Sequence, residues 1–296
     1  MIASRLSRII LVLMVAPAIS GGGIRAAAAV KTSTPFTFVV FGDNRPASKN
    51  APPPEVFREI VSEIRTLHPA FVMTTGDLVL GDKNDTAVVN QEYNETLPLV
   101  RSMGVPVYFV AGNHEMRGSA ADQSLYEKRV SPKLYYSFNY GNSHFVALDS
   151  DIVGQEHRIT GAQFNWLERD LKSVQGKVKH IFVFAHQPMY PVSLHIGSSL
   201  DVYPADRDRL QGLFEKYHVG EFICGHEHLY DYSVHDGVTN IISGGAGAPL
   251  YPSPHGGSFH HYLIITVDGG RIFISVVKPG AIIPANAVAK PAPQPK

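Results

Sequence analysis

The sequence predicts an α/β fold with a mixed sheet, and three observations lead to this prediction. In the first half, short apolar runs typical of buried strands alternate with segments whose apolar residues recur at helical spacing. Side chains of types that bind metals follow several of these apolar runs directly. In the second half, neighbouring apolar runs are separated by turn sequences such as Asp236-Gly237, which predict antiparallel hairpins.

The composition describes an ordinary globular protein. With 296 residues, the chain is long enough for one large domain with a sizeable core. Lys+Arg and Asp+Glu each number 26, so the balance of charge gives no reason to expect a nucleic-acid or membrane partner. The only cysteine, Cys224, ends an apolar run, which excludes an internal disulfide and favours a place in the core.

Residues 1–29 have the pattern of a secretory signal peptide. Arg5 and Arg8 precede an apolar run at 9–19, and a stretch of alanines follows at 26–29. An apolar run of this length is shorter than the roughly 20 residues that span a membrane. We therefore expect an exported protein, periplasmic or secreted, with no membrane span once the signal peptide is cleaved.

The first half of the mature chain predicts parallel strands joined by helices. Asp43 and Asp77 are 34 residues apart, and Asp77 and Asn113 are 36 apart, which is the length of successive βαβ units. Proline residues at 52–54 mark the start of the first helix, and Gly104 marks the end of the second. The expected strands lie at 36–41, 71–75 and 105–111, and the expected helices at 54–67 and 88–103.

The second half predicts hairpins and two more helices. The tract at 187–204 is rich in Pro, Ser and Tyr and predicts a long surface loop. One domain is expected over 33–279, followed by a disordered Pro- and Ala-rich tail at 284–296. The expected strands lie at 134–140, 144–148, 179–185, 219–224, 229–234, 238–243, 261–267 and 271–277, and the helices at 161–174 and 205–217.

Polar side chains follow five of the predicted strands. The carboxyl ends of parallel strands meet at one edge of a sheet, where α/β proteins bind ligands. His226 and His228 stand two apart after a strand, so both imidazoles point to the same side. Imidazoles, carboxylates and amides all bind transition metals. The side chains expected to gather at this edge are Asp43, Asp77, Asn113, His186, His226 and His228.

Each of these features also has a simpler interpretation. A lone aspartate after a strand usually caps a helix, and a lone His-x-His pair occurs as readily in a polar loop. The glycines at 244–247 indicate a backbone bend more than a phosphate-binding loop. Histidines 195, 255, 260 and 261 lie in segments that could reach the same edge.

Taken in order, the motifs resemble those of the calcineurin-like metallophosphoesterases, the superfamily related to purple acid phosphatases. The resemblance implies a four-layer α/β/β/α sandwich with two mixed sheets. It also implies a hydrolase with two divalent or trivalent metal ions, such as Mn, Fe or Zn, acting on a small phosphoester. The matching segments are Gly42-Asp43-x-Arg45, Gly76-Asp77, Gly112-Asn113-His114-Glu115, Ala185-His186 and Gly225-His226-x-His228.

The resemblance also implies a role for each matching residue. Asp77 would bridge the two metals, with Asp43 and His228 on one metal. The other metal would take Asn113, His186 and His226. His114 would be the general acid at the leaving group with Glu115 orienting it, and Asn113, His114 and Arg45 would contact the substrate.

Arg45 departs from the pattern, because the family usually has a ligating histidine at this position. Arginine stays protonated in proteins and cannot bind a metal. Its planar guanidinium matches two phosphate oxygens, so we expect it to turn outward, toward the substrate. The departure leaves open a second class, a catalytically weak metal- or phosphate-binding protein on the same fold.

Overall fold

The computed structural model describes residues 34–83 and 85–281. The predicted signal peptide at 1–29 and the predicted tail at 284–296 lie outside the described residues. Eleven strands form two sheets within the described part of the chain.

Both sheets mix parallel and antiparallel strands. The first has the order β11-β10-β1-β2-β3, in which β1, β2, β3 and β11 run in one direction and β10 runs against them. The second has the order β4-β5-β6-β7-β9-β8, with β5, β6, β7 and β9 parallel. The strands are β1 (Phe36–Phe41), β2 (Phe71–Thr74), β3 (Val107–Tyr108), β4 (Tyr136–Tyr140), β5 (Ser143–Ala147), β6 (His180–Phe184), β7 (Glu221–Cys224), β8 (Tyr230–His235), β9 (Val238–Ser243), β10 (Tyr262–Asp268) and β11 (Arg271–Val277).

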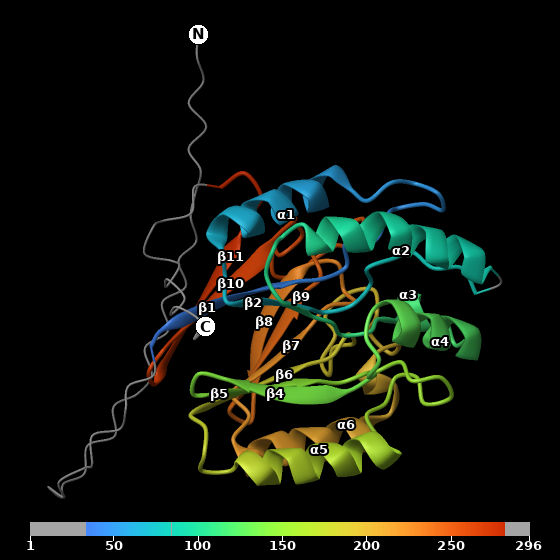
Figure 1. Cartoon of the computed structure of the whole chain (residues 1–296). Coiled ribbons are helices and arrows are strands. Elements are labelled where there is room, and N and C mark those ends of the chain that lie inside the picture. The colour runs from blue at the N-terminus through green and yellow to red at the C-terminus, as the bar shows by residue number, and fades with distance from the viewer. Residues whose placement is uncertain (1–33, 84, 282–296) are drawn as a thin grey trace, which may run out of the picture.

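Helices cover the outer face of each sheet. Figure 1 shows α1 and α2 above the first sheet and α5 and α6 below the second, with the two sheets between them. This arrangement confirms the four-layer α/β/β/α sandwich that the resemblance implied. The helices are α1 (Glu55–Leu67), α2 (Thr86–Arg101), α3 (Asn113–Met116), α4 (Ala120–Arg129), α5 (Gly161–Val174) and α6 (Pro204–Tyr217), with a 3-10 turn at Leu200–Val202.

The alternation of side chains along the strands explains the layers. In β1, Phe38 faces the second sheet, where its ring lies 5.3 Å from that of Phe182 in β6. Phe41, on the opposite face, packs 5.2 Å from Phe57 of α1. Because successive side chains of a strand point to opposite faces, an all-apolar strand such as β1 can bury both faces.

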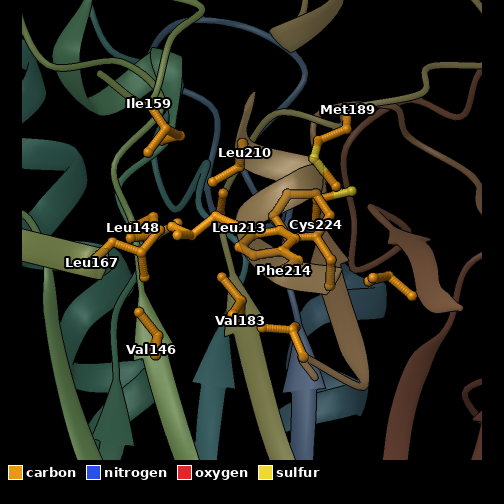
Figure 2. Packing of buried hydrophobic residues seen from close by; sticks show 14 of the residues in the cluster. Val146, Leu148, Ile159, Leu167, Val183, Met189, Leu210, Leu213, Phe214 and Cys224 are labelled. Carbon is orange, nitrogen blue, oxygen red and sulfur yellow. The ribbon is translucent and has the colours of Figure 1, made fainter. Parts of the chain in front are cut away.

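The outer layer of the second sheet is packed in the same way. Figure 2 shows Leu213 and Phe214 of α6 close to Val183 of β6. Cys224, at the end of β7, belongs to this cluster and is buried, as the sequence predicted. Burying a side chain of the size of Leu213 or Phe214 stabilises the fold by roughly 1.5–3 kcal/mol.

Most predicted elements are present, and the differences have local causes. β3 is shorter than the predicted strand at 105–111, because Pro106 has no N–H and β3 lies at the edge of its sheet. α2 begins two residues earlier than predicted because the Asp85 carboxylate accepts hydrogen bonds from the N–H groups of Ala87 and Val88. α4 was not predicted; its N-terminus is capped by Ser119.

Candidate metal centre

The strand ends of both sheets supply the candidate metal ligands. Asp43, Asp77 and Asn113 follow β1, β2 and β3 of the first sheet. The second sheet supplies the histidines, at positions 186, 226 and 228, after β6 and β7. The structure therefore brings all six predicted ligands to one edge, with three from each sheet.

Sharp backbone bends turn these side chains inward. Asp43, Asp77 and His226 all have left-handed backbones, with φ values of 58°, 56° and 68°. Such conformations are uncommon outside glycine and cluster at functional sites. Gly225, which precedes His226, leaves room for the Asp43 carboxylate, because a Cβ atom at position 225 would lie 2.2 Å from Oδ2 of Asp43.

One group of ligand atoms converges around Asn113. Its Oδ1 lies 2.9 Å from Nε2 of His186 and 3.0 Å from Nδ1 of His226. The two imidazole nitrogens are 3.1 Å apart, and Nε2 of His186 is 3.3 Å from Oδ1 of Asp77. Four candidate ligand atoms from four strand ends thus face one point.

The second group is centred on Asp43. Its Oδ1 lies 3.5 Å from Nε2 of His228. Ligand atoms of Asp43, Asp77 and His186 also lie within 4.8 Å of one another, so the two groups adjoin through Asp77. Asp77 therefore lies between the side chains of the two groups.

Hydrogen bonds on the far side of two rings indicate that these atoms are built to bind a cation. Nδ1 of His186 lies 2.7 Å from the carbonyl oxygen of Thr75, and Nδ1 of His228 lies 2.7 Å from that of Pro249. A carbonyl can only accept, so each ring donates its Nδ1–H, and its Nε2 is the atom that faces the ligand cluster. This is the usual way in which proteins orient metal-binding histidines, and the residues therefore fit a metal.

Burial shapes the charge of the site. Burial raises the pKa of Asp43 well above its ordinary value. Burial also raises the pKa of Asp77, but the charges of His114, His186 and Arg45 outweigh it and hold that pKa below its ordinary value. Burial lowers the pKa of His228 to about 4, which favours the neutral imidazole that a metal requires.

His114 lies beside the candidate ligands without joining either group. Its Nε2 is 3.7 Å from Oδ2 of Asp77. Its Nδ1 lies 2.5 Å from the carbonyl oxygen of Leu80 and 2.7 Å from Nη2 of Arg117. Arg117, which no sequence motif identified, also donates to the carbonyl oxygens of Leu80 and Gly81.

Glu115 has a different role from the one predicted. Its buried carboxylate accepts hydrogen bonds from the backbone N–H groups of Asp77, Leu78, Val79 and Gly112. The direct partners of the His114 ring are instead Leu80 and Arg117. Glu115 therefore holds the Asp77 loop against the start of α3, and burial raises its pKa to about 7.

Arg45 also differs from its expected orientation. Its Nε lies 3.5 Å from Oδ2 of Asp77, and the side chain is mostly buried. The guanidinium thus lies against the Asp77 carboxylate rather than turning outward. No described side chain accepts a hydrogen bond from Nε at normal geometry.

Two loops contribute rings that the motifs did not identify. His195 stacks on His226 with ring centroids 3.8 Å apart, and Tyr251 stacks on His228 at 4.1 Å. His195 was one of four histidines that the sequence left as candidates to reach this edge. Its loop is held by Glu227, whose buried carboxylate accepts from the N–H groups of Val192, Ser193 and His195 at 2.7, 2.7 and 3.2 Å.

A sequence profile described as "Calcineurin-like phosphoesterase" matches residues 36–230, which include every predicted ligand. The chain belongs to the calcineurin-like phosphoesterase family. Among characterised relatives, this phosphoesterase is 24% identical to tartrate-resistant acid phosphatase type 5 of Mus musculus over 225 residues, or 66% of each chain. It is 30% identical to purple acid phosphatase 23 of Arabidopsis thaliana over 139 residues, which cover 43% of this chain and 29% of that protein.

Solved structures share the fold of this phosphoesterase. Purple acid phosphatase PPD1 from yellow lupin (Lupinus luteus) gives a TM-score of 0.68 at 19% identity, covering 84% of this chain and 52% of that one. A dimetal phosphatase from Danio rerio gives a TM-score of 0.62 at 16% identity, and the match covers 83% of this chain and 99% of that one. The phosphoesterase thus spans about two thirds of the mouse protein and about half of the lupin chain. Across residues 34–83 and 85–281, no helix has both the length and the apolar character to cross a membrane.

Proposed function

We propose that this phosphoesterase is an exported, metal-dependent phosphoester hydrolase with a dinuclear centre. The position of His114 supports the proposal most directly. Its ring lies 3.7 Å from the shared Asp77 carboxylate, while its Nδ1 is engaged with Leu80 and Arg117. A protein that only bound metal would not need a histidine held beside the ligands and outside both groups.

The two ligand groups would hold two metal ions, Mn, Fe or Zn. When bound, such ions supply an activated water and neutralise charge on the phosphoryl group. Asp77 would be shared, with Asp43 and His228 completing one site and Asn113, His186 and His226 the other. The shared carboxylate suits this role because it has two oxygens.

The remaining residues act on the substrate. His114 would donate an Nε2 proton to the leaving-group oxygen as the imidazolium, because its Nδ1 already faces the carbonyl oxygen of Leu80. Burial lowers the pKa of His114 to about 4, so a substrate phosphate beside the ring would have to favour the charged form. The leaving-group oxygen needs the proton only when the alcohol is a poor leaving group. Asn113 and Arg45 would contact phosphate oxygens. The Arg45 guanidinium, already beside Asp77, can donate to a phosphate docked against the same carboxylate edge.

The second candidate, a catalytically weak metal- or phosphate-binding protein, rests on the same arginine. A permanent cation 3.5 Å from the shared carboxylate opposes metal binding there. The retained Asn113-His114-Glu115 segment favours the hydrolase. The proposed export, to a periplasm or outside the cell, rests on the pattern of residues 1–29.

The test is hydrolysis together with metal content. The mature protein is stripped with chelator and reloaded with Mn, Fe, Zn or Mg, then assayed on aryl phosphomonoesters and diesters. We expect hydrolysis that returns with about two equivalents of metal. Stoichiometric metal without hydrolysis of either ester would favour the binding protein, and failure to bind metal would exclude both proposals.

A further inference from the structure

The side chain of Arg117 contacts the ring of His114 on the side away from the candidate ligands. Nη2 of Arg117 lies 2.7 Å from Nδ1 of His114, whereas Nε2 of the same ring faces Asp77 at 3.7 Å. The two nitrogens of an imidazole are distinct and point in different directions. The guanidinium therefore lies behind the ring, where it can fix the position of His114.

A backbone turn at Leu80 and Gly81 connects the two side chains. The carbonyl oxygen of Leu80 is 2.5 Å from Nδ1 of His114, and Nη2 of Arg117 donates to the same oxygen. Nη2 also donates to the carbonyl oxygen of Gly81 at 3.3 Å. A carbonyl oxygen has two lone pairs, so that of Leu80 can accept from the ring and from the guanidinium together. Two donors that share one acceptor account for the short distance between Nδ1 and Nη2.

Glu92 of α2 holds this turn from its other side. Its buried carboxylate accepts a hydrogen bond from the backbone N–H of Gly81 at 2.9 Å. Gly81 has a left-handed backbone with a φ of 70°, and a Cβ atom there would lie 2.2 Å from the carbonyl oxygen of His114. The turn thus packs directly against the segment that carries the ring, with its N–H and its carbonyl groups both engaged.

Arg117 occupies its place at a cost in stability. It follows α3 directly and has a left-handed backbone with a φ of 45°, which is uncommon for residues other than glycine. Its Nε is buried and has no hydrogen-bond partner among the described residues. An unpaired buried donor costs about 1–3 kcal/mol. Strain of this kind persists where function requires it, so both features favour a functional reason for an arginine at position 117.

We infer that Arg117 is a positioning residue for His114, the general acid of the proposed hydrolase; the inference therefore rests on that function. The guanidinium holds the Leu80 carbonyl against Nδ1. The Nδ1–H donates to this carbonyl, which fixes the plane of the ring and leaves Nε2 as the atom that gives a proton to the leaving group. Because acid catalysis depends on this orientation, a displacement of about 1 Å costs about 10²-fold in rate.

The first measurement needs no turnover. Imidazole ¹⁵N NMR of the full chain, recorded with Zn and with chelator, reports the hydrogen-bonded Nδ1–H of His114, identified by its absence in His114→Ala. We expect this proton to exchange with water at least about tenfold faster in Arg117→Met, because the Leu80 carbonyl is no longer held. Arg117→Lys keeps a donor for that carbonyl but lacks the fork of the guanidinium, and should lie between the two. Both replacements keep a Cβ atom, so the backbone strain at position 117 is unchanged.

The second measurement compares two phosphomonoesters. Arg117→Met should lower kcat for phenyl phosphate about 10- to 100-fold, and that for 4-nitrophenyl phosphate, which has a better leaving group, by less than about threefold. KM and metal content should stay the same, and Arg117→Lys should recover part of the rate. Arg117→Met combined with His114→Ala should be no slower than His114→Ala alone, because both changes act through one ring.

Arg129→Met is the matched control. Like Arg117, Arg129 donates to a segment more than 30 positions earlier in the chain, through the side-chain oxygens of Asn90 and Asn94. The control should keep the Nδ1–H signal and the ratio of the two rates.

Three results would overturn the inference. They are a loss of equal size on both esters, an Nδ1–H of unchanged exchange in Arg117→Met, and a raised KM with unchanged kcat, which would make Arg117 a substrate contact. If the unchanged protein hydrolysed neither ester, the proposed function would fail by itself, because the NMR measurement still tests whether Arg117 holds the ring.

Discussion

At the scale of single residues, the candidate metal centre contains side chains that point at one another and one histidine, His114, that lies beside them. Asn113, His186 and His226 direct ligand atoms to within 3.1 Å of one another. His114 instead makes its closest contacts with Leu80 and Arg117. Replacing either kind of residue should therefore have different consequences for metal content and for turnover.

His114→Ala should leave metal content near that of the unchanged protein and lower kcat by roughly 10²–10⁴-fold, as for general acid–base groups. The loss should shrink for esters with good leaving groups, which depart without a proton. Metal analysis and kcat for a series of aryl phosphates check this. His226→Ala is the matched comparison and should lose metal. If His114→Ala also emptied the site, His114 would be a ligand and not the acid.

Arg45 presents the second question at this scale, because its guanidinium lies 3.5 Å from the carboxylate that both metals would share. Arg45→Ala should raise KM for phosphomonoesters about tenfold or more, the range expected for one charge-assisted hydrogen bond. Arg45→His should tighten the metal site of Asp43 by adding a ligand. Titrations of substrate, inorganic phosphate and metal test both expectations.

Lys49→Ala provides the control for Arg45. Lys49 is an exposed cation in the same loop, and it pairs with Asp82 instead of Asp77. It should change neither KM nor phosphate inhibition. If Arg45→Ala behaved like Lys49→Ala, the guanidinium would have no part in substrate binding.

At the scale of elements, the strands could be predicted and several contacts between loops could not. Apolar runs such as that of β1 are buried on both faces, so their sequence alone identifies them. The ligands could be placed because parallel strands must end at a common edge. The hydrogen bonds of Glu227 to the backbone of residues 192–195 join segments more than 30 residues apart, so no local sequence pattern predicts them.

The orientation of the Arg45 side chain could not be predicted from the sequence for a similar reason. Its neighbour Asp77 is 32 residues away, and the choice between outward and inward rotamers depends on charges that only the folded site assembles. Glu115 lies beside the candidate site, but its contacts differ from the expected contact with His114. A glutamate next to a catalytic histidine can equally bind backbone N–H groups, and four such groups lie within its reach.

Glu227→Gln tests the loop as an element. The neutral amide accepts weaker hydrogen bonds than a carboxylate, so the backbone N–H groups of Val192, Ser193 and His195 should exchange with solvent faster. Because His195 would lose its fixed place on His226, kcat/KM should fall about tenfold, one tenfold step per 1.4 kcal/mol of lost positioning. Hydrogen exchange and kinetics are measured together with metal content. Loss of metal with unchanged exchange in the loop would show that Glu227 supports the ligand histidines instead.

At the scale of the whole molecule, the candidate metal centre lies where two sheets meet. Three ligands belong to each sheet, and the apolar residues between the sheets form a separate cluster that includes Phe38, Phe145 and Phe182. Polar contacts also cross between the sheets at this edge. The Asp43 carboxylate accepts a hydrogen bond from the backbone N–H of His226, and the carbonyl oxygen of Asp43 accepts one from Ala248.

Metal removal should therefore destabilise the whole fold and not only the site. A metal that binds only the folded state at 100 times its Kd stabilises it by about 2.7 kcal/mol, which corresponds to a rise in Tm of roughly 5–10 °C for a domain of this size. Chelation should lower Tm by that amount, and adding Mn or Zn should restore it. Asp77→Ala serves as the control, since a protein without the shared ligand should show one Tm under both conditions. Hydrogen exchange should locate the change at the ends of β1 and β2, because the loss of a bound cation leaves the carboxylates of Asp43 and Asp77 side by side. A chelated protein that had lost its metal yet kept its Tm would mean that the two sheets are held together by their apolar interface alone.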